Sequence, residues 1–511
     1  MADPNIGRQD FVELTEDGDL IPIRFEVETD LSPLEAYAGA SRYSESDHSI
    51  LLESGDHSES SEMDNRGRYS FIGVDPAAIF RGGDGEAEIE SLRTEDHVLG
   101  FDETVEDGEI LEGYDVLDAL RDARPDKDPD RLDKNEGKYP LEAGFVGFHP
   151  YEMVNDTKPI DLDGEIPKSE FIYADRIIAY DHVEDEVELI FTPRENASAG
   201  EIYDNIVEEA EEYIDVLESD FELPSGIEVQ NVESGSQEDY ENMVREVKDH
   251  VVEGDTYQTV VSRKKEINAE GSPLSVYEDL RERNPSPYMY FINFGGEGIM
   301  GASPETLSRT EGDRVVTNPI AGTTKRGETP VEDRRLAGEM LSDEKELAEH
   351  VMLVDLGRND IAEVSKEDKM KVEDFMDVVK YSTVQHIEST VSGTLEEDLD
   401  EFDAMRSIFP AGTLTGAPKV RSMEIIDKLE DEPRLVYGGG VGFYADKGVS
   451  DSAITIRSAH FQENEDTFDA AVQAGAGVVA DSEAESEHDE TNDKMGSILE
   501  SFRAVDRGDK L

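Results

Sequence analysis

An internal echo limits what this chain can fold into more than any other feature. The segment AGFVGFH at residues 143–149 recurs, with the same spacing of glycine, valine and phenylalanine, as GGGVGFY at residues 438–444. Each copy is followed by the apolar–polar alternation of antiparallel strands, over 171–192 and 452–475. The echo predicts an α+β fold, a two-lobed sandwich of antiparallel β-sheets with helices packed outside. Chance similarity between two glycine-rich strands is the alternative.

A boundary between the two copies is expected near residue 230. The stretch 222–240 is rich in Pro, Gly and Ser and leads into a helical pattern of apolar residues that runs from Tyr240 to Val251. We therefore predict an N-terminal lobe over 1–230 and a catalytic region over 231–511, intertwined in one large domain. Further strands are expected over 256–268, 288–294, 298–309 and 314–320, followed by a helix from Ser342 to about Arg358.

The chain is extremely acidic, with 124 Asp and Glu against 47 Lys and Arg and a net charge of -77. A hydrophobic content of 36% indicates a folded core in spite of this charge. The acids are spread over the whole length, which excludes nucleic acid as a partner because phosphate contacts need clustered cations. Self-repulsion of such a surface reaches about 10 Å at 0.1 M salt and about 3 Å at 1 M. A halophilic cytoplasm is therefore expected, with folding that depends on salt.

Cysteine is absent from the sequence, and this excludes disulfides, thiolate metal sites and a catalytic thiolate. The N-terminus MADPNIGRQD lacks a basic and then apolar signal, and no run of 18 apolar residues occurs. We expect a soluble cytoplasmic protein that does not enter a membrane.

Two carboxylate pairs are candidates for a metal site. Glu346 and Glu349 form one pair, and Glu487 and Glu490 form the other. Residues at i and i+3 share a helix face, so each pair can direct two carboxylates at one cation. In a chain this acidic such pairs are common by chance, and a solvated acidic face is the alternative for either one. Four carboxylates without Cys or clustered His favour Mg²⁺ over zinc.

Two groups near the C-terminus suit an anionic ligand. Gly475 and Gly477, on either side of Ala476, let the backbone approach a ligand closely and offer N–H groups to an anion. Arg457, in the strand AITIRSA, can bind a carboxylate bidentately if it faces inward, and a cross-strand salt bridge is the alternative.

Other polar positions are weaker candidates by themselves. Gly322 and Thr323 in NPIAGTTKRG, and Thr413 in PAGTLTGAPK, lie in turns that offer donors to an anion. His386, in VQHIEST, is more often a structural residue than a catalyst. Glu305, in GASPETL, is one of 124 acids, and composition alone does not distinguish it.

The order of these segments resembles the chorismate-utilising enzymes, and among them the large subunit of anthranilate synthase. The resemblance covers residues 237–503 densely and is carried by GASPETL, NPIAGT, KELAEHVMLVDLGRND, VQHI, GTLTGAPKVRSM, YGGGVGF, ITIRSA and VQAGAGVVADS. The N-terminal half matches more thinly, through LLES at 51–54 and GRYSFIG at 67–73. The resemblance implies a two-lobed α+β sandwich, in agreement with the echo.

The resemblance also implies a reaction, in which chorismate and ammonia give anthranilate and pyruvate in the first step of tryptophan biosynthesis. Glu349 and Glu490 would bind Mg²⁺ directly, with Glu346 and Glu487 acting mostly through water, and the ion would hold the ring carboxylate of the substrate. Glu305 would protonate the departing ring hydroxyl, because hydroxide leaves poorly without a proton.

The remaining pocket residues follow from the same resemblance. His386 would assist the elimination of pyruvate. The pyruvyl carboxylate would be clamped by Arg457, Tyr437 and the backbone of Gly475, Ala476 and Gly477, and the pocket would be completed by Gly322, Thr323, Thr413 and Lys494.

The source of nitrogen and the control of the reaction are implied as well. Glutamine hydrolysis in the usual amidotransferase uses a cysteine, so a separate glutamine amidotransferase subunit and a hetero-oligomer are expected. A feedback site for tryptophan is expected at LLES and NPSPYM, lined by Glu53, Ser54, Pro287, Tyr288 and Met289. The acidic insertion GDHSESSEMDN after Ser54 departs from the shorter loop of the family.

Two alternatives stay open on the sequence alone. An aminodeoxychorismate synthase component I would carry a lysine within PIKGT where this chain has Ala321. A non-catalytic acidic protein that binds cations or tryptophan would explain the acids but not Arg457, Lys419 or Lys494. Relatives that add water to chorismate use a lysine base where this chain has Gln258, and glutamine cannot take a proton from water.

Overall fold

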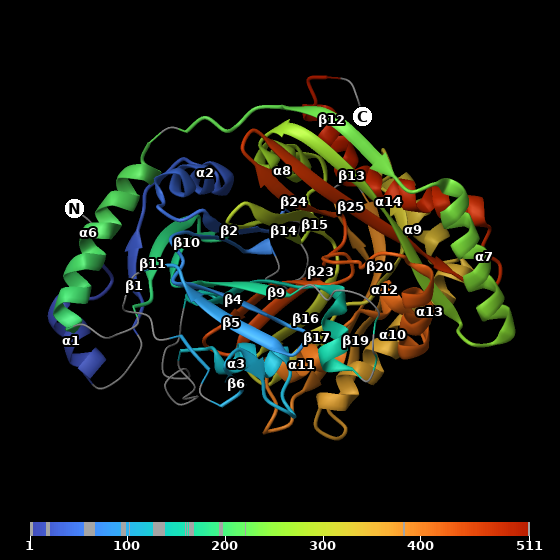
Figure 1. The fold of residues 1–511 in the computed structure, drawn as a ribbon, viewed down its shortest axis with the longest axis horizontal. Coiled ribbons are helices and arrows are strands. Elements are labelled where there is room, and N and C mark those ends of the chain that lie inside the picture. Colours follow the sequence, from blue (N-terminus) through green and yellow to red (C-terminus); the bar gives the residue numbers. More distant parts are fainter. Residues whose placement is uncertain are drawn as a thin grey trace.

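Two antiparallel sheets packed face to face form the protein, with helices on both outer faces (Figure 1). The computed structural model describes residues 4–16, 21–55, 67–93, 99–101, 103–125, 138–158, 160, 162, 168–193, 198–219, 221–381 and 384–508. This confirms the predicted α+β class and the sandwich of antiparallel sheets. Within these residues no helix is both long enough and apolar enough to cross a membrane.

The first sheet has 12 strands in its described part. Its order is β1 (Ile23–Glu26), β11 (Glu186–Phe191), β10 (Arg176–Asp181), β3 (Tyr69–Gly73), β2 (His48–Glu53), β14 (Tyr288–Phe294), β15 (Glu297–Ser303), β24 (Ser458–Asn464), β25 (Thr467–Val478), β13 (Gln258–Gly271) and β12 (Ile227–Ser234), with the short β21 (Gly416–Ala417) on β13.

The second sheet has 13 strands in its described part. Its order is β18 (Ile320–Lys325), β20 (Val384–Thr394), β17 (Arg314–Thr317), β16 (Thr306–Glu311), β23 (Val449–Ile454), β22 (Gly440–Ala445), β8 (Gly144–His149), β9 (Ser169–Ala174), β4 (Ala78–Gly83), β5 (Glu86–Ser91), β7 (Glu109–Ile110) and β6 (Val105–Glu106), with β19 (Lys371–Lys380) on β20.

Helices cover the outer faces of both sheets. They are α1 (Arg8–Glu16), α2 (Pro33–Tyr43), α3 (Val116–Asp122), α5 (Val154–Thr157), α6 (Ala199–Leu217), α7 (Gln237–Glu253), α8 (Pro273–Arg283), α9 (Pro330–Met340), α10 (Glu344–Val364), α11 (Glu401–Ile408), α12 (Gly412–Thr415), α13 (Lys419–Leu429) and α14 (Ala484–Val505). In the view of Figure 1, α2 and α8 lie above the sandwich and α3 and α11 lie below it.

The strand orders show an approximate twofold relation between the two halves of the chain. In the first sheet β2 lies beside β14, and β3, β10 and β11 follow outward on one side as β15, β24 and β25 do on the other. In the second sheet β8 lies beside β22, flanked by β9 and β4 on one side and β23 and β16 on the other. Both sheets therefore draw strands from both halves. The predicted division near residue 230 stays a prediction.

The two copies of the sequence echo are β8 and β22, and they are direct neighbours. Gly147 pairs with Gly442 at equivalent positions of the two copies. A Cβ added at either glycine would collide with a carbonyl oxygen of the next strand, at Glu170 or Asp451. The copies thus pair within one sheet instead of facing each other from two sheets, because the glycines let four strands approach closely at the centre.

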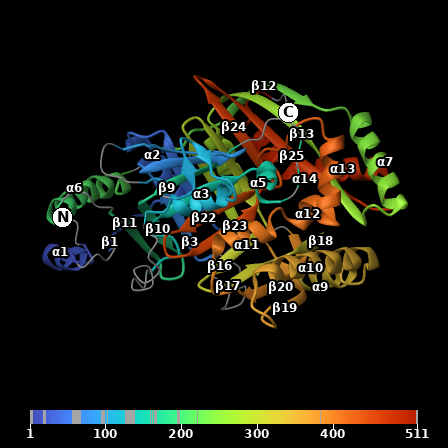
Figure 2. The same cartoon turned by 60° about the horizontal axis from the view of Figure 1, so that its bottom comes forward.

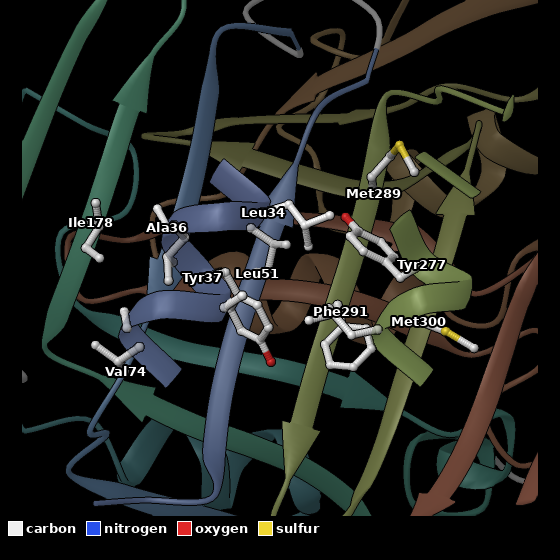
Figure 3. Packing of buried hydrophobic residues seen from close by; sticks show 14 of the residues in the cluster. Leu34, Ala36, Tyr37, Leu51, Val74, Ile178, Tyr277, Met289, Phe291 and Met300 are labelled. Atoms are coloured by element: carbon white, nitrogen blue, oxygen red, sulfur yellow. The ribbon is translucent and has the colours of Figure 1, made fainter. Parts of the chain in front are cut away.

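A second repeat links the outer helices. Helices α2 and α8 begin with the same letters, SPLxxY, and in both a serine caps the N-terminus and a proline occupies the first turn. Figure 3 shows the tyrosines of the two repeats, Tyr37 and Tyr277, on either side of Phe291 in β14. Each tyrosine ring lies 5.7 Å from the Phe291 ring. The repeat therefore packs both helices onto the middle of the first sheet.

Four buried clusters stabilise the described part of these layers. One lies between the first sheet and its helices, a second between the two sheets, a third between the second sheet and its helices, and a smaller fourth between α7, α13 and the strands β13 and β25. The middle cluster includes Phe148 and Phe443 from the echo strands, which point into the space between the sheets. Figure 2 shows that α9, α10, β18, β19 and β20 gather at one end of the molecule.

Candidate active site

Glu305 lies where the chain crosses from one sheet to the other. The expected strand 298–309 is wrong in its middle, since β15 ends at Ser303 in the first sheet and β16 begins at Thr306 in the second. Pro304 has no N–H to continue the ladder, and the break leaves Glu305 outside both strands. The Ile454 amide donates to the Glu305 carbonyl at 3.0 Å, which joins this crossing to the end of β23.

The Glu305 side chain is only 7% exposed. Burial, with a smaller contribution from Glu388, raises the pKa of Glu305 to about 8, against the opposing effects of the Thr413 hydroxyl, the Ile320 backbone and Arg457. The carboxyl group is therefore protonated at neutral pH and can act as a proton donor.

His386 is buried in β20 at 1% exposure. Gly322 and Thr323 lie beside it in strand β18, at a register shift of the ladder and not in the expected turn. Its Nδ1 lies 2.8 Å from the Thr323 hydroxyl and 3.4 Å from the Gly322 carbonyl oxygen. Burial, helped by Arg457, lowers the pKa of His386 to about 4, so the ring is neutral. The Gly322 carbonyl oxygen can only accept a hydrogen bond, so the proton of the neutral ring belongs on Nδ1. Nε2 is then unprotonated and can act as a base. Among the described residues nothing hydrogen-bonds to Nε2.

Arg457 lies at the crossing from β23 to β24, with a left-handed φ of 51°. Burial lowers the pKa of its guanidinium, and Glu305 opposes this effect. In the described part of this acidic chain, no carboxylate forms an ion pair with Arg457 within 4.0 Å. A partly buried guanidinium without such a partner is suited to binding a carboxylate of a ligand.

The backbone of β25 approaches the same region. A Cβ added at Gly475 would lie 2.8 Å from the Tyr437 hydroxyl, and one added at Gly477 would collide with the side-chain amide of Gln258. Lys494 donates from Nζ to the Gly475 carbonyl at 2.9 Å. Only glycine at 475 and 477, on either side of the fully buried Ala476, lets these side chains reach the strand.

The two predicted carboxylate pairs lie on two different helices, and a glutamate of one helix affects the pKa of a glutamate of the other. Glu346 and Glu349 belong to α10, and Glu487 and Glu490 belong to α14. The pKa of Glu346 is raised by burial first and also by Glu349 and Glu490. Burial also raises the pKa of Glu487, and Glu490 adds to this effect. The charged forms of Glu346 and Glu487 are therefore disfavoured by burial and by the neighbouring glutamates.

Two contacts connect these carboxylates to the rest of the site. Glu349 accepts a hydrogen bond from Gln258 Nε2 at 2.9 Å, and Glu490 pairs with Lys494 at 2.8 Å. A Cβ at Gly322 would lie 3.4 Å from Glu346 Oε2, which places this part of strand β18 against α10. The site thus extends from β18 and β20 across α10 to α14 and β25.

The donor set suits a hard cation, although it is not tightly gathered. All four groups offer carboxylate oxygens, and a divalent cation between α10 and α14 would relieve their repulsion. Among the described residues, only His250, Glu253 and Asp255 bring three ligand atoms within 4.8 Å of one another. Asp255 of that group is already paired with Arg421 at 2.7 Å.

A separate cavity of about 300 Å³ lies between the two sheets. It brings together all five positions of the expected feedback site, and it is lined by Glu53, Ser54, Pro287, Tyr288 and Met289 together with aromatic rings of both sheets. Glu53 accepts hydrogen bonds from Tyr277 and Arg281, and the Ser54 hydroxyl oxygen is buried without a partner among the described residues. The acidic insertion lies almost wholly outside the described residues, at 56–66.

One hydroxyl connects this cavity to the proton donor. Tyr288 lies 2.9 Å from the Thr306 hydroxyl and donates to Asp451 at 2.9 Å. Thr306 directly follows Glu305 in the chain. A ligand that moves Tyr288 therefore acts one residue away from Glu305.

Two residues of this region carry contacts that the sequence did not indicate. Gln258 was of interest only as a replacement for lysine, yet it binds Glu349. Arg434 is 2% exposed and lies 5.6 Å from the ring of Tyr437. Its position three residues before Tyr437, as one of 47 cations among 124 acids, is the signal that could have identified it.

Comparison with known proteins agrees with this arrangement. Residues 47–500 match the family of chorismate binding enzymes. The anthranilate synthase component 1 of the halophilic archaeon Haloferax volcanii is 44% identical over 99% of this chain and 99% of its own length. An anthranilate synthase component 1 of Haloarcula marismortui is also 44% identical, over 98% of this chain and 96% of its own.

Solved structures show the same fold. The anthranilate synthase component I from Streptococcus pneumoniae superimposes with a TM-score of 0.68 at 31% identity, covering 87% of this chain and 94% of that one. MenF, the menaquinone-specific isochorismate synthase from Escherichia coli, has a TM-score of 0.68 at 15% identity over 97% and 99% of the two chains, a likeness of fold alone. The chain therefore belongs to the family of chorismate binding enzymes.

Proposed function

We propose that this protein is the large subunit of an anthranilate synthase, which converts chorismate and ammonia into anthranilate, pyruvate and water. The buried, protonated Glu305 beside Arg457, which has no described ion-pair partner, carries this proposal, because it places a proton donor next to a carboxylate-binding group. The full-length similarity to relatives named anthranilate synthase component 1 supports the same assignment.

The first step replaces the ring hydroxyl of chorismate by an amine. The nitrogen of ammonia forms a bond to the ring, the ring carbon–hydroxyl bond breaks, and Glu305 supplies the proton with which the hydroxyl leaves as water. Arg457 and the backbone of 475–477 hold the pyruvyl carboxylate, so the reacting carbon is fixed relative to Glu305.

The second step eliminates pyruvate and makes the ring aromatic. A base removes the ring proton, the bond from the ring to the enolpyruvyl oxygen breaks, and the released enol becomes pyruvate. The free Nε2 of His386 fits the role of this base, because the neutral ring is held by Thr323 and Gly322 through its other nitrogen.

Glu349 and Glu490 would hold a Mg²⁺ ion, with Glu346 and Glu487 around it. This ion would supply positive charge for the ring carboxylate of chorismate. Gln258 positions Glu349 through its hydrogen bond at 2.9 Å, and Lys494 positions Glu490 through its ion pair.

A separate glutamine amidotransferase would supply the ammonia. Relatives carry the name component 1, and the absence of cysteine from this chain removes the usual nucleophile for glutamine hydrolysis. The isolated chain should form fluorescent anthranilate from chorismate, ammonium and Mg²⁺ in molar KCl, and should form none when glutamine replaces ammonium. Aminated chorismate that accumulates without anthranilate would identify an aminodeoxychorismate synthase instead.

The cavity between the sheets would bind tryptophan as a feedback inhibitor. Because the chain has no tryptophan, the fluorescence of the added amino acid reports its binding without background. Tyr288→Phe keeps the ring in the cavity but removes the hydroxyl that bridges to Thr306. We expect this variant to bind tryptophan within about threefold of the parent and to lose most of the inhibition, since only the bridge is broken. Ser54→Phe, which fills the cavity without adding a tryptophan to the chain, should abolish both the binding and the inhibition. Unchanged inhibition in both variants would place the regulatory site elsewhere.

A further inference from the structure

Arg434 is a buried cation whose guanidinium uses all three of its nitrogens in hydrogen bonds, although no expected role involves it. It lies 2% exposed in the connection between α13 and β22. Its Nε and one terminal nitrogen donate to the two oxygens of Glu430 at 2.8 and 2.7 Å. The guanidinium also lies over two rings, 4.7 Å from that of Tyr151 and 5.6 Å from that of Tyr437.

The other donors of Arg434 reach two further walls of the proposed pocket. One terminal nitrogen donates to the Leu414 carbonyl at 2.7 Å, next to Thr413. The other donates to the Val260 carbonyl at 2.8 Å, and Val260 is the strand partner of Gly477. The guanidinium therefore connects the α12 turn, strand β13 and the Tyr437 ring.

Glu430 extends the same network on its far side. Its Oε1 accepts from the backbone amide of Ser262 at 2.7 Å and from the Ser262 hydroxyl at 2.9 Å, so β13 is held at two points. Glu430 thereby fixes the plane of the guanidinium, and the plane sets where the Tyr437 ring lies.

Only arginine can make this set of contacts. A planar fork donates in three directions within one plane while its face lies against a ring, whereas an ammonium group is a point charge without a face. The hydroxyl of Tyr437 lies against Gly475, where a Cβ would be 2.8 Å away, so a shift of the ring is passed directly to the β25 backbone.

We propose that Arg434 is a positioning residue of the substrate pocket, which sets the distance between Tyr437, the Thr413 turn and the β25 glycines through its planar contacts. This inference rests on the proposed function, in which Tyr437 and the glycine backbone bind the pyruvyl carboxylate. Arg434 itself does not touch the substrate.

The test is a double-mutant cycle between Arg434→Lys and Tyr437→Phe, measured as the KM for chorismate and as kcat with ammonium. Lysine keeps a positive charge to pair with Glu430 but lacks the planar guanidinium group. We expect Arg434→Lys to raise KM about 10-fold or more and to lower kcat by less than about threefold, because Glu305 and His386 are not moved. In the Tyr437→Phe background, Arg434→Lys should raise KM by a factor that is at least threefold smaller than the factor in the parent.

Arg121→Lys is the matched control. Arg121 is a partly buried guanidinium that also pairs with a carboxylate, Asp400 at 2.8 Å, and lies 5.4 Å from the ring of Phe402, but its hydrogen bonds and ion pairs with the described residues include no wall of the pocket. We expect this variant to lower the melting temperature and to leave KM unchanged. Far-ultraviolet circular dichroism checks that each variant is folded.

The outcomes separate the inference from the function on which it rests. If Tyr437→Phe alone leaves KM unchanged, the pocket assignment is wrong. If that variant raises KM but the effects of the two substitutions multiply independently, Arg434 has only a structural role and the inference is overturned. If Arg434→Lys does not fold, Glu430→Gln replaces it in the same cycle with the same criteria. Glu430→Gln weakens the hydrogen bonds to the Arg434 guanidinium and keeps the packing around it.

Discussion

Glu305 combines deep burial with a guanidinium as a neighbour, and the two act on its proton in opposite directions. Burial dominates, and the pKa is raised to about 8. The side chain therefore remains protonated and can act as an acid. This lowers the stability of the folded state near neutral pH, because the charged form of Glu305 is disfavoured there. Nothing in the letters GASPETL indicates this, because the effect comes from the residues that surround the sheet crossing.

The raised pKa predicts the pH dependence of catalysis. At constant free ammonia, kcat/KM should fall as the pH rises through about 8, because Glu305 loses its proton. Glu305→Gln, which cannot give up a proton, should lower kcat by about 10²- to 10⁴-fold. Rate profiles between pH 6 and 9.5 measure both. A profile that is flat up to pH 9.5 would exclude Glu305 as the acid.

The same group predicts a pH-dependent gain of stability in that variant. The folded parent holds a proton on Glu305 up to about pH 8, whereas the unfolded chain loses it near 4.5, so stability of the parent falls as the pH rises between these values. The Glu305→Gln variant does not lose stability in this way, because the glutamine side chain does not titrate. The melting temperature of Glu305→Gln should therefore exceed that of the parent by a margin that grows from pH 5 to 8 and then levels off. Glu388→Gln, at a neighbouring buried carboxylate, is the comparison.

At the scale of elements, the site is assembled where strands change sheets and where helices face each other. Glu305 and Arg457 lie at the two crossings, joined by the hydrogen bond from Ile454. Helices α10 and α14 bring carboxylates together against their mutual repulsion. The i, i+3 spacing of each pair could be predicted from the sequence, whereas the approach of Glu490 to Glu346 depends on how segments far apart in the chain fold together.

This repulsion predicts how divalent cations change stability. Without Mg²⁺, Glu487→Gln should raise the melting temperature, because it removes a carboxylate whose charged form is disfavoured by burial and by Glu490. Mg²⁺ should raise the melting temperature of the parent more than that of the variant. Glu485→Gln, an exposed neighbour on the same helix, should respond to Mg²⁺ as the parent does. Equal responses in all three proteins would argue against a cation between the helices.

At the scale of the whole molecule, the fold class and the family could be predicted from the sequence, but the way the halves combine could not. The echo at 143–149 and 438–444 indicates related halves, and the SPLxxY repeat that begins α2 and α8 gains its meaning only from the packing of both helices on one sheet. The pairing of β8 with β22 is a long-range contact that periodicity does not reveal. Prediction of the strand 298–309 failed for a local reason, the proline at 304.

The charge of the whole chain predicts its response to salt. The net charge of -77 is distributed over both halves, so folding brings like charges together on every face. The melting temperature should rise steadily between 0.1 and 2 M KCl, because the screening length falls from about 10 Å to below about 3 Å. Tetramethylammonium chloride at equal ionic strength should give most of the effect. A melting temperature independent of salt would contradict this account.

The twofold strand order has a consequence for how the chain can be divided. If the backbone were cut near residue 230, each piece would keep half of both sheets and would expose two unpaired edges, at β2 and β8 in one piece and at β14 and β22 in the other. Each such edge is a template for the other piece. The two halves would thus behave as complementary subunits that form a complete sandwich only when they associate with each other.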